Sequence, residues 1–443
     1  MSLWMMPEEL SAWFGLLAGC LDVRNQARFL ALLGGVVFAR GRRTVTSWLR
    51  AAGIADEFRP AYGLLWTVGR RAGGMATRLL LSVLGPLARG RPRLLFGLDD
   101  TPTKRYGPCV EGAGVHHNPT PGPAGQEFVY GHVWVTLAWL VRHPRWGSIA
   151  LPLRAGLYVR RKDAAKLPPE YGWAFRTKLT LAAELLHWLA LWLRHWGVRL
   201  WLAADGAYAR REVLRAARRE GIVVVSRLRR DAALRDLPGP RPKGRRGRPA
   251  VYGRNRIDLA KRAGQRRGWR EEEFGLYGRA ERLRYKTFLA TWRPAGGVIR
   301  VVLVRRGGAW AAFFCTEPGA SAADVLTAVA DRASIEQAFH DLKEVWGAGQ
   351  QQLRNVWANV GAFHLNLWLH TLVELWAWRR SAGRLRDRKE SPWDDAERRP
   401  SHADRCNALK REGLRQEFRC VGRRRPLTRK IQALFRGLLK LIA

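Results

Sequence analysis

The sequence predicts a mixed α/β fold in which helices flank one central sheet and a helical region precedes it. Residues 1–90 carry apolar residues at helical spacing and few strand-like runs. The next residues introduce short apolar runs, of which LLFGL (94–98) is the first. Residues 197–228, GVRLWLAADGAYARREVLRAARREGIVVVSRL, have the order strand, turn, helix, strand that is typical of α/β domains.

The same patterns predict the organisation of the chain. Further strands are expected at 128–140, 146–159 and 284–317, and helices at 175–197 and 354–379, with a long helix between 317 and 354 that holds residues 333–347. Within the first region, RGRRTVTSWLRAAGI (40–54) predicts a short helix that Thr44 or Thr46 caps and Gly53 ends. We therefore expect a helical N-terminal region, a core in two segments, an insertion with a basic arm and strands, and a basic tail: 1–90, 91–228 with 318–380, 229–317, and 381–443.

The charge balance indicates an anionic partner. The 443 residues include 78 Lys plus Arg against 37 Asp plus Glu, a formal net charge of +41. Such a charge repels itself unless an anion neutralises it, and double-stranded nucleic acid is the leading candidate. The most apolar stretches, 185–205 and 363–378, are interrupted by polar or charged residues and do not predict membrane spans.

The cysteines and the N-terminal residues bear on the compartment. The five cysteines are scattered and form no Cys-x-x-Cys pair, which argues against a disulfide framework and against a cysteine zinc site. The first residues, MSLWMMPEELSAWF, lack the basic region of a secretory signal. We expect a cytoplasmic protein.

The stretch ASIEQAFHDLKEVWG (333–347) predicts a helix with a chemically interesting face. At roughly 100° per residue, Arg332 and Lys343 fall within about 40° of Glu336, whereas Asp341 falls about 140° away. An apolar stripe borders this face. Glu336 is therefore the carboxylate placed for chemistry, and the alternative interpretation is an ordinary amphipathic helix.

Two further acids follow predicted strands. Asp205 comes directly after the apolar run 198–204, and Asp99 and Asp100 follow 94–98. Side chains at strand ends collect ligands in α/β sheets. Two Asp and one Glu from different elements of one sheet can hold two divalent cations such as Mg²⁺, which act on phosphodiesters. Arg332 and Lys343 beside the Glu could then bind phosphate oxygens.

These segments resemble the DDE transposases of bacterial insertion sequences. One group of that family has a third segment with the spacing of Arg332, Glu336 and Lys343, although its Tyr position is Val329 here. LDDTPTKRYG and WLAADGAYA resemble the first and second segments. The resemblance implies a ribonuclease H-like core, and the family's Asp-x-Thr pattern favours Asp99 over Asp100 as the first metal ligand.

The function that the resemblance implies is DNA transposition. Asp99, Asp205 and Glu336 would hold two Mg²⁺ ions, with Mn²⁺ as a substitute, and the enzyme would cleave element ends and join them to target DNA. Residues 1–90 and the basic arm would bind DNA, and a homodimer is expected on it. The alternatives are a ribonuclease H-like nuclease without strand transfer and a non-catalytic DNA-binding protein derived from a transposase.

Other residues carry weaker signals. Arg42 and Arg43 precede a short helix and suit phosphate contact, but a plain surface helix explains them equally well. GRRGRP (244–249), with Arg245, Arg246 and Arg248, resembles a minor-groove-binding AT-hook core, and the alternative is a solvated basic loop. Three histidines lack a fourth zinc ligand at ordered spacing, so we expect them to form hydrogen bonds near the site: His116, His117 and His132.

Overall fold

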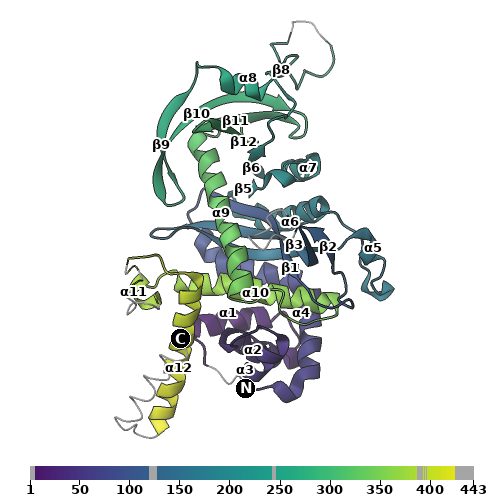
Figure 1. Ribbon diagram of the computed structural model, residues 1–443, viewed down its shortest axis with the longest axis vertical. Helices are drawn as coiled ribbons and strands as arrows, with labels where there is room; N and C mark the ends of the chain where they lie inside the picture. Colours follow the sequence, from purple (N-terminus) through teal and green to yellow (C-terminus); the bar gives the residue numbers. More distant parts are fainter. Residues whose placement is uncertain are drawn as a thin grey trace.

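The computed structural model describes residues 5–118, 127–241, 246–386, 393, 395 and 397–424. Over these residues, twelve strands form one mixed sheet (Figure 1). The strands are β1 (Arg93–Lys104), β2 (Gly114–His117), β3 (Phe128–His143), β4 (Gly147–Tyr158), β5 (Arg199–Ala204), β6 (Val223–Leu228), β7 (Leu234–Arg235), β8 (Arg256–Ile257), β9 (Arg270–Leu276), β10 (Arg279–Trp292), β11 (Gly297–Arg306) and β12 (Ala309–Cys315). The mixed α/β fold predicted from the sequence is confirmed.

The centre of the sheet is parallel and its two sides are antiparallel. β1, β5 and β6 run parallel, β3 and β4 continue the sheet antiparallel beyond β1, and β12 pairs antiparallel with β6. β11 and β10 follow β12, so the strands of residues 279–315 extend the same sheet. β3 is buried along nearly its whole length, which shows that elements cover both of its faces.

The helices lie around this sheet and at its lower end in Figure 1. They are α1 (Glu8–Ala18), α2 (Val23–Phe38), α3 (Val45–Ala52), α4 (Phe58–Arg78), α5 (Arg161–Ala164), α6 (Lys178–Leu193), α7 (Arg211–Arg219), α8 (Leu259–Gly264), α9 (Ala322–Glu344), α10 (Val356–Ala377), α11 (Ala382–Leu385) and α12 (His402–Arg424). No described helix is both long enough and apolar enough to cross a membrane.

Helix α9 crosses the sheet from β12 toward α10 (Figure 1). Its start is fixed by a capping box, in which Ser321 and Asp324 each accept the other's backbone N–H. Adjacent residues of a strand point to opposite faces. Asp99 of β1 contacts α9 through Arg332, and Asp100 contacts α6 through Lys178. Helices α9 and α6 therefore cover opposite faces of β1.

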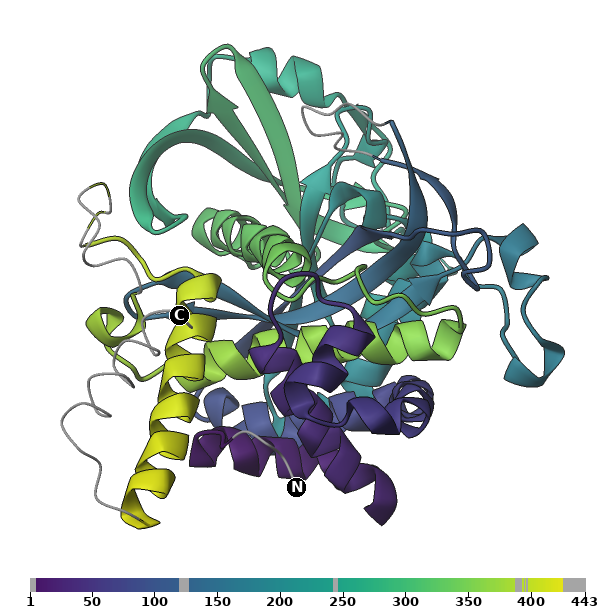
Figure 2. The same ribbon diagram turned by 60° about the horizontal axis from the view of Figure 1, so that its bottom comes forward.

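The short helix α3 begins and ends where its sequence predicts. The Thr44 hydroxyl accepts the Ser47 backbone N–H at 3.2 Å, and Gly53 adopts the left-handed conformation with φ of 67°. The helices α1 to α4 pack together beside α10, on the side away from the β9–β12 strands (Figure 2).

Two glycines allow the N-terminal helices to dock on the core. An ideal Cβ on Gly69 of α4 would lie 1.9 Å from the Trp357 carbonyl oxygen of α10. An ideal Cβ on Gly361 of α10 would lie 2.0 Å from the Leu65 carbonyl oxygen of α4. The two backbones are therefore in direct contact, and only glycine fits at the crossing.

We predict that Gly69→Ala destabilises the protein, because a methyl group at the crossing must push two backbones apart. Overpacking of this kind costs about 1–3 kcal/mol or more. Gly63→Ala is the matched control, since Gly63 lies in the same helix with open space around its Cβ position and should gain up to about 1 kcal/mol. Thermal or urea unfolding measures both variants, and equal stabilities would contradict the close crossing.

Candidate active site

Asp99 and Asp205 lie side by side where the parallel pairing of β1 with β5 ends. In the β1–β5 pairing, Leu98 lies opposite Ala204, so the next residue on each strand is an aspartate at the same level. β5 ends there, and the Asp205 carboxylate accepts the Ala207 N–H at 3.0 Å, which caps the 3-10 turn Gly206–Tyr208. Strand pairing brings together two acids that are 106 residues apart in the sequence.

Arg332 of α9 connects Asp99 with Glu336. One guanidinium nitrogen lies 2.6 Å from Asp99 Oδ2, and another lies 2.8 Å from Glu336 Oε1. The Glu336 side chain is 60% exposed, whereas those of Arg332 and Asp99 are 20% and 17% exposed. The guanidinium is thus a cation held between two carboxylates, of which Asp99 is mostly covered and Glu336 is exposed to solvent.

The electrostatics of Asp99 reflect this crowding. The pKa of Asp99 is raised to about 7, mainly by burial; the Arg332 guanidinium opposes this rise, and the Asp205 and Asp100 carboxylates add to it. Asp99 and Asp205, with Asp100 nearby, are stable as carboxylate anions only when enough positive charge is close. Their donor atoms are all carboxylate oxygens, the ligands that Mg²⁺ and Mn²⁺ prefer. The residues fit a hard divalent cation.

A family described as DDE superfamily endonuclease matches residues 16–293, which is more than half of the chain. The chain belongs to this family. The predicted family and its ribonuclease H-like mixed α/β fold are thereby confirmed, and membership implies a nuclease that acts on DNA. A search of curated proteins found none that matches. Asp99 and Asp205 fall inside the matched range, and Glu336 lies beyond its end.

Asp100 lies on the other face of β1 in this DDE superfamily protein. Its carboxylate accepts the Tyr208 hydroxyl at 2.6 Å and lies 2.7 Å from the Lys178 ammonium. Burial raises the pKa of Tyr208, and Asp100 raises it further, so the phenol stays protonated and donates. Asp100 therefore fixes the turn that follows Asp205, a long-range contact that sequence reasoning did not find.

The other residues of α9 that the sequence analysis considered, Lys343 and Val329, make no polar contact with the three acids within the residues that the structure describes. Lys343 is partly buried, and burial lowers its pKa. Over the described chain, no hydrogen bond or ion pair joins it to the three acids. Val329, at the family's Tyr position, lines a separate cavity of about 280 Å³ with Arg230 and Trp310.

The basic residues predicted to contact DNA differ in their environment. Arg42 is exposed and lies 5.9 Å from the Tyr106 ring, in the loop after β1. The Arg43 guanidinium instead donates to the Val36 and Ala39 carbonyl oxygens at the end of α2. Arg246 and Arg248 are exposed, and Arg245 lies outside the described residues.

The three histidines near the first hairpin differ in their environments, and His132 has the clearest hydrogen bonds. The two ring nitrogens of His132 contact the Arg105 guanidinium at 3.1 Å and the Glu111 carbonyl oxygen at 2.9 Å. His117 packs edge-on against Phe128. His116 is partly buried, and its Nε2 has no hydrogen-bond partner among the described residues.

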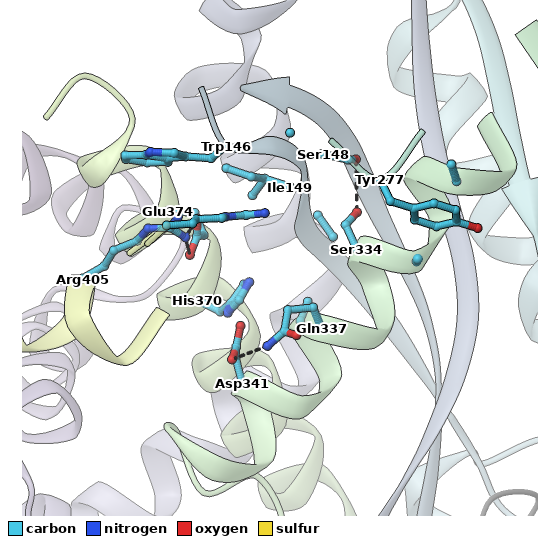
Figure 3. Close-up of a pocket in the computed structure, with 16 residues that line it drawn as sticks. Trp146, Ser148, Ile149, Tyr277, Ser334, Gln337, Asp341, His370, Glu374 and Arg405 are labelled. Carbon is cyan, nitrogen blue, oxygen red and sulfur yellow. Dashed lines mark hydrogen bonds and ion pairs between the residues drawn. The ribbon is translucent and has the colours of Figure 1, made fainter. Parts of the chain in front are cut away.

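A second group of polar side chains lies beside α9, around a cavity of about 230 Å³ that residues of α9, α10 and α12 line (Figure 3). Asp341 and His370 both line it, and His402 completes a buried trio whose potential ligand atoms lie within 4.8 Å of one another. Within the described ranges, this is the only such trio, so Glu336 does not converge with Asp99 and Asp205 as closely. Sequence reasoning missed this group because its members come from three helices.

The raised pKa of Asp99 predicts a pH dependence of stability. A carboxyl group that is more basic when folded contributes stability at low pH and loses it as the pH rises through about 7. We therefore expect Asp99→Asn to become progressively more stable relative to wild type from about pH 5 to about pH 8, in urea unfolding with chelator present.

Asp324→Asn is the control for this measurement. Burial raises the pKa of Asp324, but hydrogen bonds from Ser321 and Arg93 outweigh burial and leave the pKa below 3.8. Its contribution is lost only as the pH falls below that value, so the variant should show no trend in the same window. A flat difference for Asp99→Asn as well would contradict the raised pKa.

Proposed function

We propose that the protein is a DNA transposase that cleaves the ends of its element and joins them to target DNA in a metal-dependent reaction. The observation that carries the proposal is that Asp99 lies beside Asp205, with Arg332 contacting both Asp99 and Glu336. The chain belongs to the DDE superfamily and has a net charge of +41. The superfamily supports nuclease chemistry, and transposition is the finer assignment that we add.

Asp99, Asp205 and Glu336 would hold two Mg²⁺ ions, which Mn²⁺ could replace. When bound, the ions supply the positive charge that activates the attacking oxygen and stabilises the leaving oxygen of the phosphodiester. Asp99 lies on β1, and Asp205 directly follows Ala204, the last residue of β5 that pairs with β1. Glu336 has an exposed side chain and reaches the site by turning away from Arg332.

Arg332 has two roles in this proposal. Without a divalent cation it neutralises Asp99 and Glu336, to which it is bonded at 2.6 and 2.8 Å. Once the carboxylates have another cation, its planar guanidinium is free to bind two phosphate oxygens of the DNA strand. We assign Lys343, two turns further along α9, to phosphate binding as well.

The basic N-terminal loop is tied to the catalytic core. The Arg43 backbone N–H donates to the Gln350 side chain at 2.8 Å, and Gln351 donates to the Arg43 carbonyl oxygen at 3.1 Å. Exposed Arg42 therefore sits at a fixed position relative to the loop after β1. We propose that residues 1–90 and the arm around Arg246 and Arg248 hold double-stranded DNA while the strand end enters the site.

The paired ends of a transposable element require two active sites, so we propose a homodimer assembled on DNA in the cytoplasm. A ribonuclease H-like nuclease without strand transfer remains the second candidate, since hydrolysis uses the same carboxylates. A non-catalytic DNA-binding protein has no need for adjacent, partly buried aspartates, whose repulsion costs stability.

Labelled duplexes that carry the element's ends, incubated with target DNA and Mg²⁺, separate these functions. We predict joined products; cleavage alone would indicate the nuclease, and binding alone the non-catalytic protein. Asp99→Asn, Asp205→Asn and Glu336→Gln should each reduce cleavage beyond the roughly 10- to 100-fold loss expected for a residue that only orients a metal ligand. DNA binding should change little, because its affinity comes mainly from Lys and Arg.

Asp100→Asn is the matched control for Asp99→Asn. Its amide oxygen can still accept the Tyr208 hydroxyl, and only the charge pairing with Lys178 is lost. We expect a smaller loss of activity than for Asp99→Asn. The reverse order would reassign the first ligand to Asp100.

A further inference from the structure

The buried trio of Asp341, His370 and His402 joins three helices at one point. Asp341 lies on α9, His370 on α10 and His402 at the first residue of α12, and their potential ligand atoms lie within 4.8 Å of one another. His370 and His402 are each 3% exposed, and Asp341 is 9% exposed. The trio lies on the side of α9 away from Glu336, so it is separate from the candidate active site.

The surroundings of His402 determine which nitrogen carries its lone pair. Nδ1 lies 2.6 Å from the Glu374 carboxylate, which can only accept, so Nδ1 carries the proton. Nε2 accepts the Trp346 indole N–H at 2.8 Å, which requires a lone pair on Nε2. Burial lowers the pKa of His402, but Cys406 and Glu374 outweigh burial and raise the pKa to about 10, so a metal ion would compete with a proton for this lone pair. A carboxylate behind an imidazole is the arrangement that orients histidine ligands in metal sites.

His370 presents a second lone pair. Its ring is stacked on that of His402 with centroids 4.1 Å apart, and one of its nitrogens is held by a backbone hydrogen bond with Ala150. Nδ1 is buried and has no hydrogen-bond partner in the described part of the chain. A buried nitrogen without a partner is costly, and a bound ion would satisfy it.

Asp341 supplies the anionic member of the trio. It accepts the Gln337 side-chain N–H at 3.1 Å, and a carboxylate has further lone pairs to offer (Figure 3). The same view places His370 between Asp341 and Glu374. Asp341 and His370 also line the cavity of about 230 Å³, which leaves room for a water or small anion.

We propose that Asp341, His370 and His402 bind one borderline divalent ion of the Zn²⁺ type. Two imidazole nitrogens and one carboxylate are a common zinc ligand set, whereas Mg²⁺ and Ca²⁺ prefer oxygen ligands alone. Three protein ligands leave one position open toward the cavity. The ion replaces the Trp346 N–H at His402 Nε2, at the cost of one hydrogen bond.

The charges around the cavity are balanced. Arg405 is paired with Glu374, and Arg399 lies on the same cavity wall, so positive charge is close to the site. Asp341 and Glu374 offset these two guanidiniums, and an anionic fourth ligand such as hydroxide or chloride is favoured. The bound ion would fasten α12 to α9 and α10, close to the helix that carries Glu336.

Zinc binding to the full-length chain tests the site independently of the proposed function. In an Asp99→Asn/Asp205→Asn background, which weakens binding at the candidate active site, chelator-treated protein dialysed against Zn²⁺ should retain about one ion per chain. Adding Asp341→Asn should weaken zinc binding more than roughly 100-fold, because a ligand contributes more than a residue that only orients one. The amide of this variant keeps an oxygen for the Gln337 hydrogen bond, which favours its folding.

Two further variants complete the test. His340→Ala removes the exposed imidazole next to Asp341 and should leave zinc binding unchanged. Trp346→Phe removes the competing N–H and should tighten binding roughly 2- to 10-fold, which is the value of one hydrogen bond. Failure of the background protein to bind Zn²⁺, or equal binding with and without Asp341→Asn, would overturn the proposal.

Discussion

The parallel pairing of β1 with β5 is the constraint on which the candidate site depends. It places Asp99 beside Asp205 at the point where β5 ends, and partial burial there makes an isolated anion unfavourable. The fold accommodates this repulsion with one guanidinium, that of Arg332, which also holds Glu336. In the proposed function, a divalent ion bound by these carboxylates would relieve their repulsion.

Helix α9 connects the candidate site with the helices on its other side. One side carries Arg332 and Glu336 toward β1, and the other carries Asp341 toward α10 and α12. Helix α10 in turn contacts α4 at the glycine crossing, which links the N-terminal helices to the same framework. The candidate site, the N-terminal helices and α12 therefore all contact α9 or α10. A shift of α9 would change the contacts of all three.

Local patterns were sufficient to predict much of this arrangement. The apolar runs before Asp99 and Asp205 predicted two strands, and helical periodicity placed Arg332 with Glu336 and Asp341 on another face. β5 ends next to Asp205 as expected, whereas β1 continues past Asp99 to Lys104, because β3 pairs with it there. The caps of α3 followed from Thr44 and Gly53 alone. These features depend on residues within about two helical turns of one another, or on one strand, so local sequence patterns are enough to predict them.

Partners far apart in the chain could not be predicted in this way. Arg332 and Asp99 are 233 residues apart, and Asp100 meets Tyr208 across 108 residues. Arg43 suits phosphate contact in sequence, but packing turns its guanidinium back onto the end of α2. The apolar sequence around His370 predicts only a buried helix. The residues near its ring, Asp341 and His402, belong to α9 and α12, so the local sequence does not reveal them. Tertiary packing decides these contacts.

Anomalous diffraction from crystals soaked in Mn²⁺ tests the central claim most directly, since it locates the cation itself. The account predicts an anomalous peak in contact with the carboxylates of both Asp99 and Asp205, with Glu336 turned toward it and the Arg332 guanidinium withdrawn from Asp99. Crystals that show no peak at these two aspartates, with Arg332 still bridging Asp99 and Glu336, would contradict the account.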